Sequence, residues 1–233
     1  MPAVPPPIRV LITGFGAFSR VSDNPSYKIA LALPPTLPDI TLHSYPHPVR
    51  VSYPSITTLI PSLWRPRTFS YILHIGVGIG PRYALETRAW EHGYASPDVD
   101  NFAPDTSRER EDWGRCLKTG VDVPKVLEEV RGKVQLPEGM TVGLSENAGR
   151  YLCEYVYFAS LREEETAGES GRVLFLHVPP EEAGGSVDVG VEVVKAVVEA
   201  LVRCGERGDR AAEGGEQGDA AAAGGGKGGV VFE

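Results

Sequence analysis

The chain has 233 residues, 42% of them hydrophobic, which is enough for one domain with a sizeable buried core. Its formal net charge of −8 argues against nucleic acid or an anionic membrane surface as the main partner. No apolar run approaches the roughly 18 residues that span a bilayer, and the Pro-rich extension at residues 1–7 lacks the apolar segment of a signal peptide. We therefore expect a cytoplasmic protein.

In the first half of the chain, apolar runs predict strands and capped segments predict helices. Strands are expected at residues 8–14, 40–45, 71–76 and 83–90, and helices at residues 24–33 and 52–63. Asn24 suits a helix cap and Pro25 suits the first helical position. Residues 95–120 are rich in Asp, Arg, Pro and Ser, which predicts a long excursion from the regular elements. Loops of this length are usually functional or mobile.

In the second half, the same patterns alternate. Helices are expected at residues 123–130 and 148–161, strands at 140–143 and 172–177, and a polar turn at 162–171. Residues 186–203 fit both a strand alternation and a helical repeat, and their length favours a helix. The Gly/Ala-rich tail at residues 205–233 cannot bury enough apolar surface to offset its ordering entropy, so disorder is predicted there.

Alternating strands and helices predict an α/β fold, a three-layer α/β/α sandwich around a mostly parallel twisted sheet, in a single domain over residues 8–204. In such sheets, sites form at the carboxyl ends of the strands. Two glycine segments, residues 14–16 and 76–78, and His177 each follow an apolar run directly. We expect them at one edge of the sheet.

Cys153 is a candidate nucleophile, because it follows a predicted helix start, where the positive end of the helix dipole favours a thiolate. Burial as a small core residue is the alternative. Two histidines, His177 and His74, end similar strands and could each supply a base. Glu86 lies in an apolar stretch, where a carboxylate is rarely buried unless it is paired. A thiol, an imidazole and a carboxylate are the parts of a cysteine hydrolase.

Other chemistries are less well supported. The segment from Gly14 to Ser19 lacks the third glycine of a dinucleotide fingerprint, and residues 76–82 lack the Lys-Ser/Thr of a phosphate loop. The three cysteines show no CxxC spacing, so neither a zinc site nor a disulfide framework is expected. A non-catalytic α/β module that binds a small molecule or nucleotide stays open as an alternative, as does an altered relative that acts through its tail.

Four separated pieces of the chain resemble the pyroglutamyl peptidase I family of cysteine peptidases, in its animal and fungal form. The pieces are LITGFGAF at residues 11–18 with NPS at 24–26, HIGV at 74–77 through LE at 85–86 and HGY at 92–94, AGRYLCEY at 148–155, and LHVPP at 176–180. They occur in the family's order and span residues 8–180. Members of this family remove an N-terminal pyroglutamate from peptides.

The resemblance implies a triad in which Cys153 is the nucleophile, His177 the base and acid, and Glu86 the residue that orients the imidazole; it favours His177 over His74. It also implies that a set of residues binds the substrate: Phe15, Phe18, Asn24, Gly76 and Val77. No metal or cofactor is expected, and the partners are N-terminally pyroglutamylated peptides, with a homo-oligomer left open.

Overall fold

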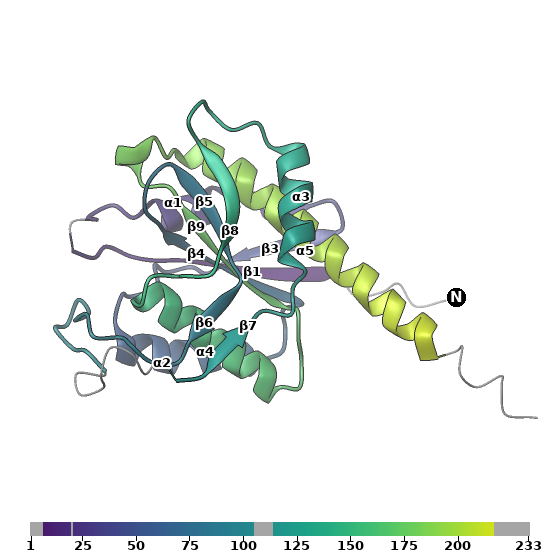
Figure 1. Ribbon diagram of the computed structural model, residues 1–233, viewed down its shortest axis with the longest axis horizontal. Helices are drawn as coiled ribbons and strands as arrows, with labels where there is room; N and C mark the ends of the chain where they lie inside the picture. Colours follow the sequence, from purple (N-terminus) through teal and green to yellow (C-terminus); the bar gives the residue numbers. More distant parts are fainter. Residues whose placement is uncertain (1–6, 20, 105–113, 217–233) are drawn as a thin grey trace, which may run out of the picture.

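The computed structural model describes residues 7–19, 21–104 and 114–216 (Figure 1). Its strands are β1 (Ile8–Gly14), β2 (Thr36–Leu37), β3 (Ile40–Ser44), β4 (Tyr71–Val77), β5 (Arg82–Glu86), β6 (Arg88–Trp90), β7 (Cys116–Lys118), β8 (Thr141–Ser145) and β9 (Val173–Val178). Its helices are α1 (Pro25–Ala32), α2 (Tyr53–Trp64), α3 (Val123–Lys133), α4 (Leu152–Thr166) and α5 (Val187–Glu216), with a short 3₁₀ helix at Glu181–Ala183.

Seven strands form one sheet in the order β2-β3-β1-β4-β9-β5-β8. The neighbours β3, β1, β4 and β9 are parallel, so their carboxyl ends meet at one edge, as predicted for the two glycine segments and His177. The strand β5 runs antiparallel to β9, and β8 runs parallel to β5. The sheet is therefore mixed but mostly parallel.

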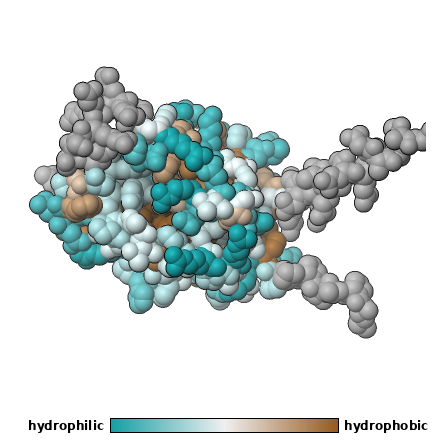
Figure 2. Space-filling view, turned by 90° about the horizontal axis from the view of Figure 1, so that it is seen from below, coloured by the Kyte–Doolittle hydropathy of each residue, from teal (hydrophilic) through white to brown (hydrophobic). Residues whose placement is uncertain are grey.

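Helices cover both faces of this sheet, which confirms the predicted α/β sandwich (Figure 1). Successive side chains of a strand point to opposite faces. One set, including Val10 and Leu174, packs against α1, α3 and α5, and the other, including Val173 and Phe175, packs against α2 and α4. Figure 2 shows the molecule from the side of α2 and α4, where hydrophilic residues are interspersed with small hydrophobic spots.

Local sequence signals explain the helix that follows the first glycine loop. The side chain of Asn24 accepts a hydrogen bond from the Ser26 N–H, and Pro25 occupies the first helical position, as predicted for this helix. The side chains of Ile29 and Ala30 are buried against the sheet. This capped start fixes the exit of the loop that joins β1 to α1.

The predicted strand at residues 83–90 is wrong in one respect, because the chain changes sheets at Thr87. Residues up to Glu86 pair with β8 and β9, whereas β6 pairs with β7 in a separate two-stranded sheet. The strand β7 lies within the predicted excursion at residues 95–120, whose centre lies outside the described residues. Pairing partners this distant in sequence are not visible in a local pattern.

The predicted helix at residues 148–161 begins four residues too early. Gly149 and Arg150 have φ values of 98° and 51°, which a right-handed helix excludes, so α4 begins at Leu152. It also continues to Thr166 through residues predicted as a turn, because Arg and Glu are good helix formers. Cys153 is consequently the second residue of its helix.

The tail prediction is also partly wrong. The helix α5, expected at residues 186–203, extends through residues 205–216, which composition predicts to be disordered, and projects from the body in Figure 1. Extending an existing helix avoids the cost of a new nucleus, so alanines and charged residues can prolong it. Residues 1–6 and 217–233 lie outside the described residues.

Across the described ranges, none of the helices combines the length and hydropathy of a bilayer-crossing segment.

Candidate active site

Cys153 lies in the first turn of α4, directly above strand β4. A Cβ atom placed on Gly76 would lie 2.9 Å from the Cys153 Sγ and 2.8 Å from the Phe175 Cζ. Only glycine therefore lets the sulfur approach the strand this closely. The Tyr151 side chain does not cap the helix, and Cys153 lies in the first turn, where the positive end of the helix dipole acts on the thiol.

His177 and Glu86 come to the same site from neighbouring antiparallel strands. His177 is paired with Ala84 across the β9–β5 ladder, so Glu86, two residues further along β5, shares its face of the sheet. The Glu86 Oε1 lies 2.8 Å from the His177 Nδ1. The Cys153 thiol lies close enough to the same imidazole to raise the pKa of His177. Three residues far apart in sequence thus converge.

The charge of His177 is set by opposing effects. Burial lowers the pKa of His177, but the hydrogen bonds and charge attraction from Cys153 and Glu86 outweigh it and raise the pKa to about 10. Glu86 is only 1% exposed, and a carboxylate at that depth needs a partner. The site therefore favours an imidazolium between the thiol and the carboxylate.

Tyr157 fixes the main chain at Glu86. Its hydroxyl donates a hydrogen bond of 2.9 Å to the main-chain carbonyl of Glu86. Tyr157 lies on α4 one turn after Cys153, so both side chains point from the same side of the helix toward the sheet. The helix that carries the thiol is therefore tied directly to the strand that carries the carboxylate.

His74, the rival imidazole, has a different environment. It is fully buried, and its Nδ1 lies 2.7 Å from the Thr13 Oγ1. Burial lowers the pKa of His74 to about 3, so the ring is neutral at physiological pH. No carboxylate contacts His74 among the described residues, whereas Glu86 contacts His177. The paired imidazole is therefore that of His177.

A small apolar pocket opens beside the thiol. It is lined by Phe15, Phe18, Asn24, Val51, Val77, Tyr151, Leu152 and Cys153. Four of the five residues expected to bind substrate belong to this lining, and the fifth, Gly76, lies beneath the sulfur instead. The sequence reasoning missed Val51, Tyr151 and Leu152, although an aromatic residue two positions before the cysteine is a visible signal. The rings of Phe18 and Tyr151 lie 6.1 Å apart.

Asn24 lines the pocket, but its amide is already engaged within the protein. Its Nδ2 donates to the Gly16 carbonyl at 3.0 Å, and its Oδ1 accepts from the N–H and the hydroxyl of Ser26. Gly14 packs against the start of α1, where an added Cβ would lie 2.6 Å from the Ser26 carbonyl oxygen. These contacts shape the loop that carries Phe15 and Phe18. They also explain why residue 14 is a glycine without requiring a bound nucleotide.

The chain is 31% identical over 196 residues to pyroglutamyl-peptidase 1 of Homo sapiens and to that of Mus musculus, in each case over 83% of this chain and 89% of the relative. A solved pyrrolidone carboxyl peptidase from Thermococcus litoralis superposes with a TM-score of 0.71 at 21% identity, covering 86% of this chain and 96% of that one. No protein-family model matches the chain.

Proposed function

The chain belongs to the pyroglutamyl-peptidase 1 family, and from that premise we propose that it is a cysteine peptidase acting on peptides with an N-terminal pyroglutamyl residue. It hydrolyses the amide bond that follows this residue. The observation that carries the proposal is the chain of contacts from Glu86 through His177 to Cys153, beside an apolar pocket.

The nucleophile is activated by its surroundings. His177 takes the thiol proton on the nitrogen that faces Cys153, while Glu86 accepts a hydrogen bond from Nδ1 and stabilises the resulting imidazolium. The raised pKa of His177, about 10, agrees with this ion pair. The positive end of the helix dipole at the start of α4 favours the thiolate further.

The reaction then proceeds in two steps. The Cys153 sulfur forms a bond to the carbonyl carbon between pyroglutamate and the next residue, and main-chain N–H groups at the start of α4 stabilise the oxyanion. The imidazolium gives its proton to the leaving amine, and the C–N bond breaks to leave a thioester. Water, deprotonated by His177, attacks the thioester, and the sulfur leaves to release pyroglutamate.

The pocket suits a neutral lactam. Pyroglutamate has no free amine, and its ring offers one N–H donor and one carbonyl acceptor. Phe15, Phe18 and Tyr151 supply the apolar walls, and Val77, which also lines the pocket, brings main-chain groups that could supply the complementary donor and acceptor. A free N-terminal ammonium is rejected, because it would lose its hydration without gaining a charged partner.

Hydrolysis of a pyroglutamyl anilide, compared with a glutaminyl anilide, tests the proposal. We expect release from the first alone, and its loss in Cys153→Ala. His177→Ala should reduce turnover far more than His74→Ala, because of these two histidines it is His177 that contacts Glu86. Turnover in Cys153→Ala, or a larger loss in His74→Ala, would refute the assigned residues. Equal hydrolysis of both anilides would refute the specificity.

A reducing compartment, the cytoplasm, suits this chemistry. None of the three cysteines forms a disulfide in the described part of the chain, and a thiolate nucleophile is preserved where disulfides are kept reduced. Fractionation of cells that express the chain, with turnover assayed in each fraction, tests this location.

A further inference from the structure

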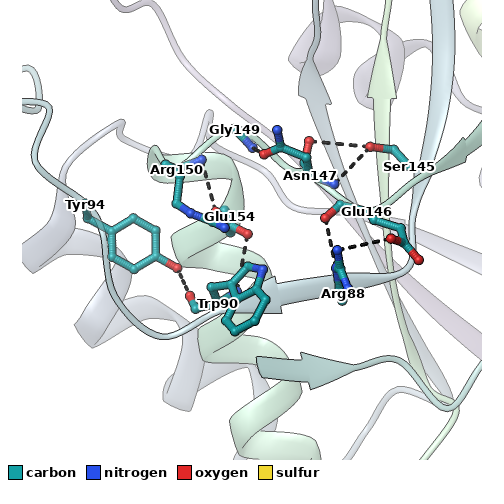
Figure 3. Close-up of polar contacts among 9 residues, drawn as sticks. All are labelled: Arg88, Trp90, Tyr94, Ser145, Glu146, Asn147, Gly149, Arg150 and Glu154. Carbon is teal, nitrogen blue, oxygen red and sulfur yellow. Dashed lines mark hydrogen bonds and ion pairs between the residues drawn. The ribbon is translucent and has the colours of Figure 1, made fainter. Parts of the chain in front are cut away.

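One buried carboxylate next to the nucleophile has no part in the proposed triad. Glu154 directly follows Cys153 in α4 and is 0% exposed. One of its oxygens, Oε2, accepts a 3.0 Å hydrogen bond from the Arg150 main-chain N–H and pairs with the Arg150 guanidinium. The other, Oε1, accepts a 3.3 Å hydrogen bond from the Trp90 main-chain N–H. Figure 3 shows these contacts converging on Glu154.

The backbone that these contacts hold has an unfavourable conformation. Arg150 has a φ of 51°, a left-handed value that costs a residue other than glycine about 1–2 kcal/mol. The neighbouring Gly149 has a φ of 98°. Together they turn the chain sharply from the loop after β8 into the first turn of α4. Such a turn persists only where the surrounding contacts determine it.

The outer part of the same loop has weaker support. The Asn147 Oδ1 accepts a hydrogen bond from the Gly149 N–H, and Arg88 contacts both the carbonyl and the carboxylate of Glu146 (Figure 3). The Glu146 side chain is 68% exposed, and an exposed ion pair contributes little. The contacts of Glu154 are buried and charge-assisted, so they dominate the geometry of the turn.

Glu154 also joins two parts of the proposed site. Through Arg150 it holds the turn that leads into Cys153, and through Trp90 it holds β6, which continues the chain just beyond Glu86. The guanidinium of Arg150 lies over the Trp90 ring, 5.6 Å from its centroid, and closes this arrangement. A carboxylate in the first turn of a helix is additionally stabilised by the helix dipole.

Resting on the proposed peptidase function, we propose that Glu154 is a positioning residue: it fixes the turn at Gly149 and Arg150, so that the main-chain N–H groups at the start of α4 face the oxyanion. Glu154 contacts neither substrate nor thiol proton in this role. Its loss is expected to misdirect the oxyanion donors while the thiol–imidazole pair stays intact.

Glu154→Gln tests this role against Glu164→Gln. Glu164 is a buried carboxylate of the same helix that also accepts a main-chain N–H, that of Arg172, but lies about 15 Å further along the axis. For each variant, the folded sites are counted by active-site titration with a thiol alkylator, and kcat and KM for the pyroglutamyl anilide are measured per titrated site.

We expect kcat per site to fall about 10-fold to 100-fold in Glu154→Gln with KM little changed, since losing an oxyanion donor costs about 10²–10³ and glutamine keeps one acceptor oxygen. Glu164→Gln should keep the wild-type kcat per site even if it lowers stability. The rate of Cys153 alkylation by iodoacetamide should be unchanged in both variants, because that displacement forms no oxyanion.

A pyroglutamyl aldehyde adds a direct readout of the oxyanion. The Cys153 sulfur adds to the aldehyde carbon, the thiol proton passes to His177, and the aldehyde oxygen becomes an alkoxide in the place of the oxyanion, so affinity should fall in Glu154→Gln in parallel with kcat/KM. Arg150→Lys, which keeps the charge but loses the planar fork, should show a smaller loss of the same kind.

The outcomes separate the two proposals. Wild-type kcat per site in Glu154→Gln, or a matching fall in Glu164→Gln, overturns the positioning role alone. A fall in the alkylation rate that matches the fall in kcat also overturns it, because the thiol pair would then be the damaged part. If the wild-type protein does not hydrolyse the pyroglutamyl anilide, the peptidase proposal is overturned, and this role with it.

Discussion

Gly76→Ala is the sharpest test of the geometry beneath the nucleophile. The added Cβ would lie 2.9 Å from the Cys153 Sγ and 2.8 Å from the Phe175 Cζ, whereas ordinary contacts begin at 3.4 Å. The sulfur or the ring must therefore retreat by about 0.5 Å or more, and such overpacking typically costs about 1–3 kcal/mol of stability. The Phe175 ring is buried, whereas the thiol borders the pocket and can retreat only by changing its position relative to His177.

This displacement should lower the rate as well as the stability. A misplacement of about 1 Å can cost 100-fold in rate, so a shift of half that size predicts a fall in kcat of about tenfold. Denaturant unfolding and anilide hydrolysis measure the two effects. Gly132→Ala is the matched control, because a Cβ there meets nothing within 4 Å and helix α3 should gain about 0.5–1 kcal/mol. Gly76→Ala with wild-type kcat and stability would refute the placement of the sulfur.

Two further predictions concern pH. Glu86→Gln removes an anion that raises the pKa of His177, so the alkaline limb of kcat/KM should move down from about pH 10; an upward shift would contradict the pairing. For His74, the folded-state pKa of about 3 lies below its ordinary 6.5, so the unfolded chain binds the proton first as pH falls. Between about pH 6.5 and about pH 3, the unfolding free energy should then drop by up to about 1.4 kcal/mol per pH unit, and His74→Asn should lose this slope.

Locally encoded features were predictable from the sequence. Asn24 and Pro25 specify the start of α1 through capping and a fixed φ, so the prediction needed no distant partner. The continuous apolar run of β4 likewise reflects burial on both faces. The start of α4 was misplaced because the turn at Gly149 and Arg150 depends on a contact with Trp90 outside the local window.

The arrangement of the candidate site was less predictable. The residues 86 and 177 were identified from chemistry and a family resemblance, but their meeting depends on β5 running antiparallel beside β9. Strand direction is decided by pairing partners across the sheet, so the apolar pattern of residues 82–86 does not predict it. The carboxylate of Glu154 carried a weak signal, an acidic residue in the first turn of a helix, which is common enough to be passed over.

The antiparallel ladder between β5 and β9 also ties activity to the completeness of the fold. The carboxylate and imidazole that it aligns are 91 residues apart in sequence, and a slip of one residue would turn Glu86 to the opposite face. Contacts of such long range form late in folding. A partly assembled chain, however helical, would hold its thiol without an acid–base partner, so full activity requires the β5–β9 ladder to form.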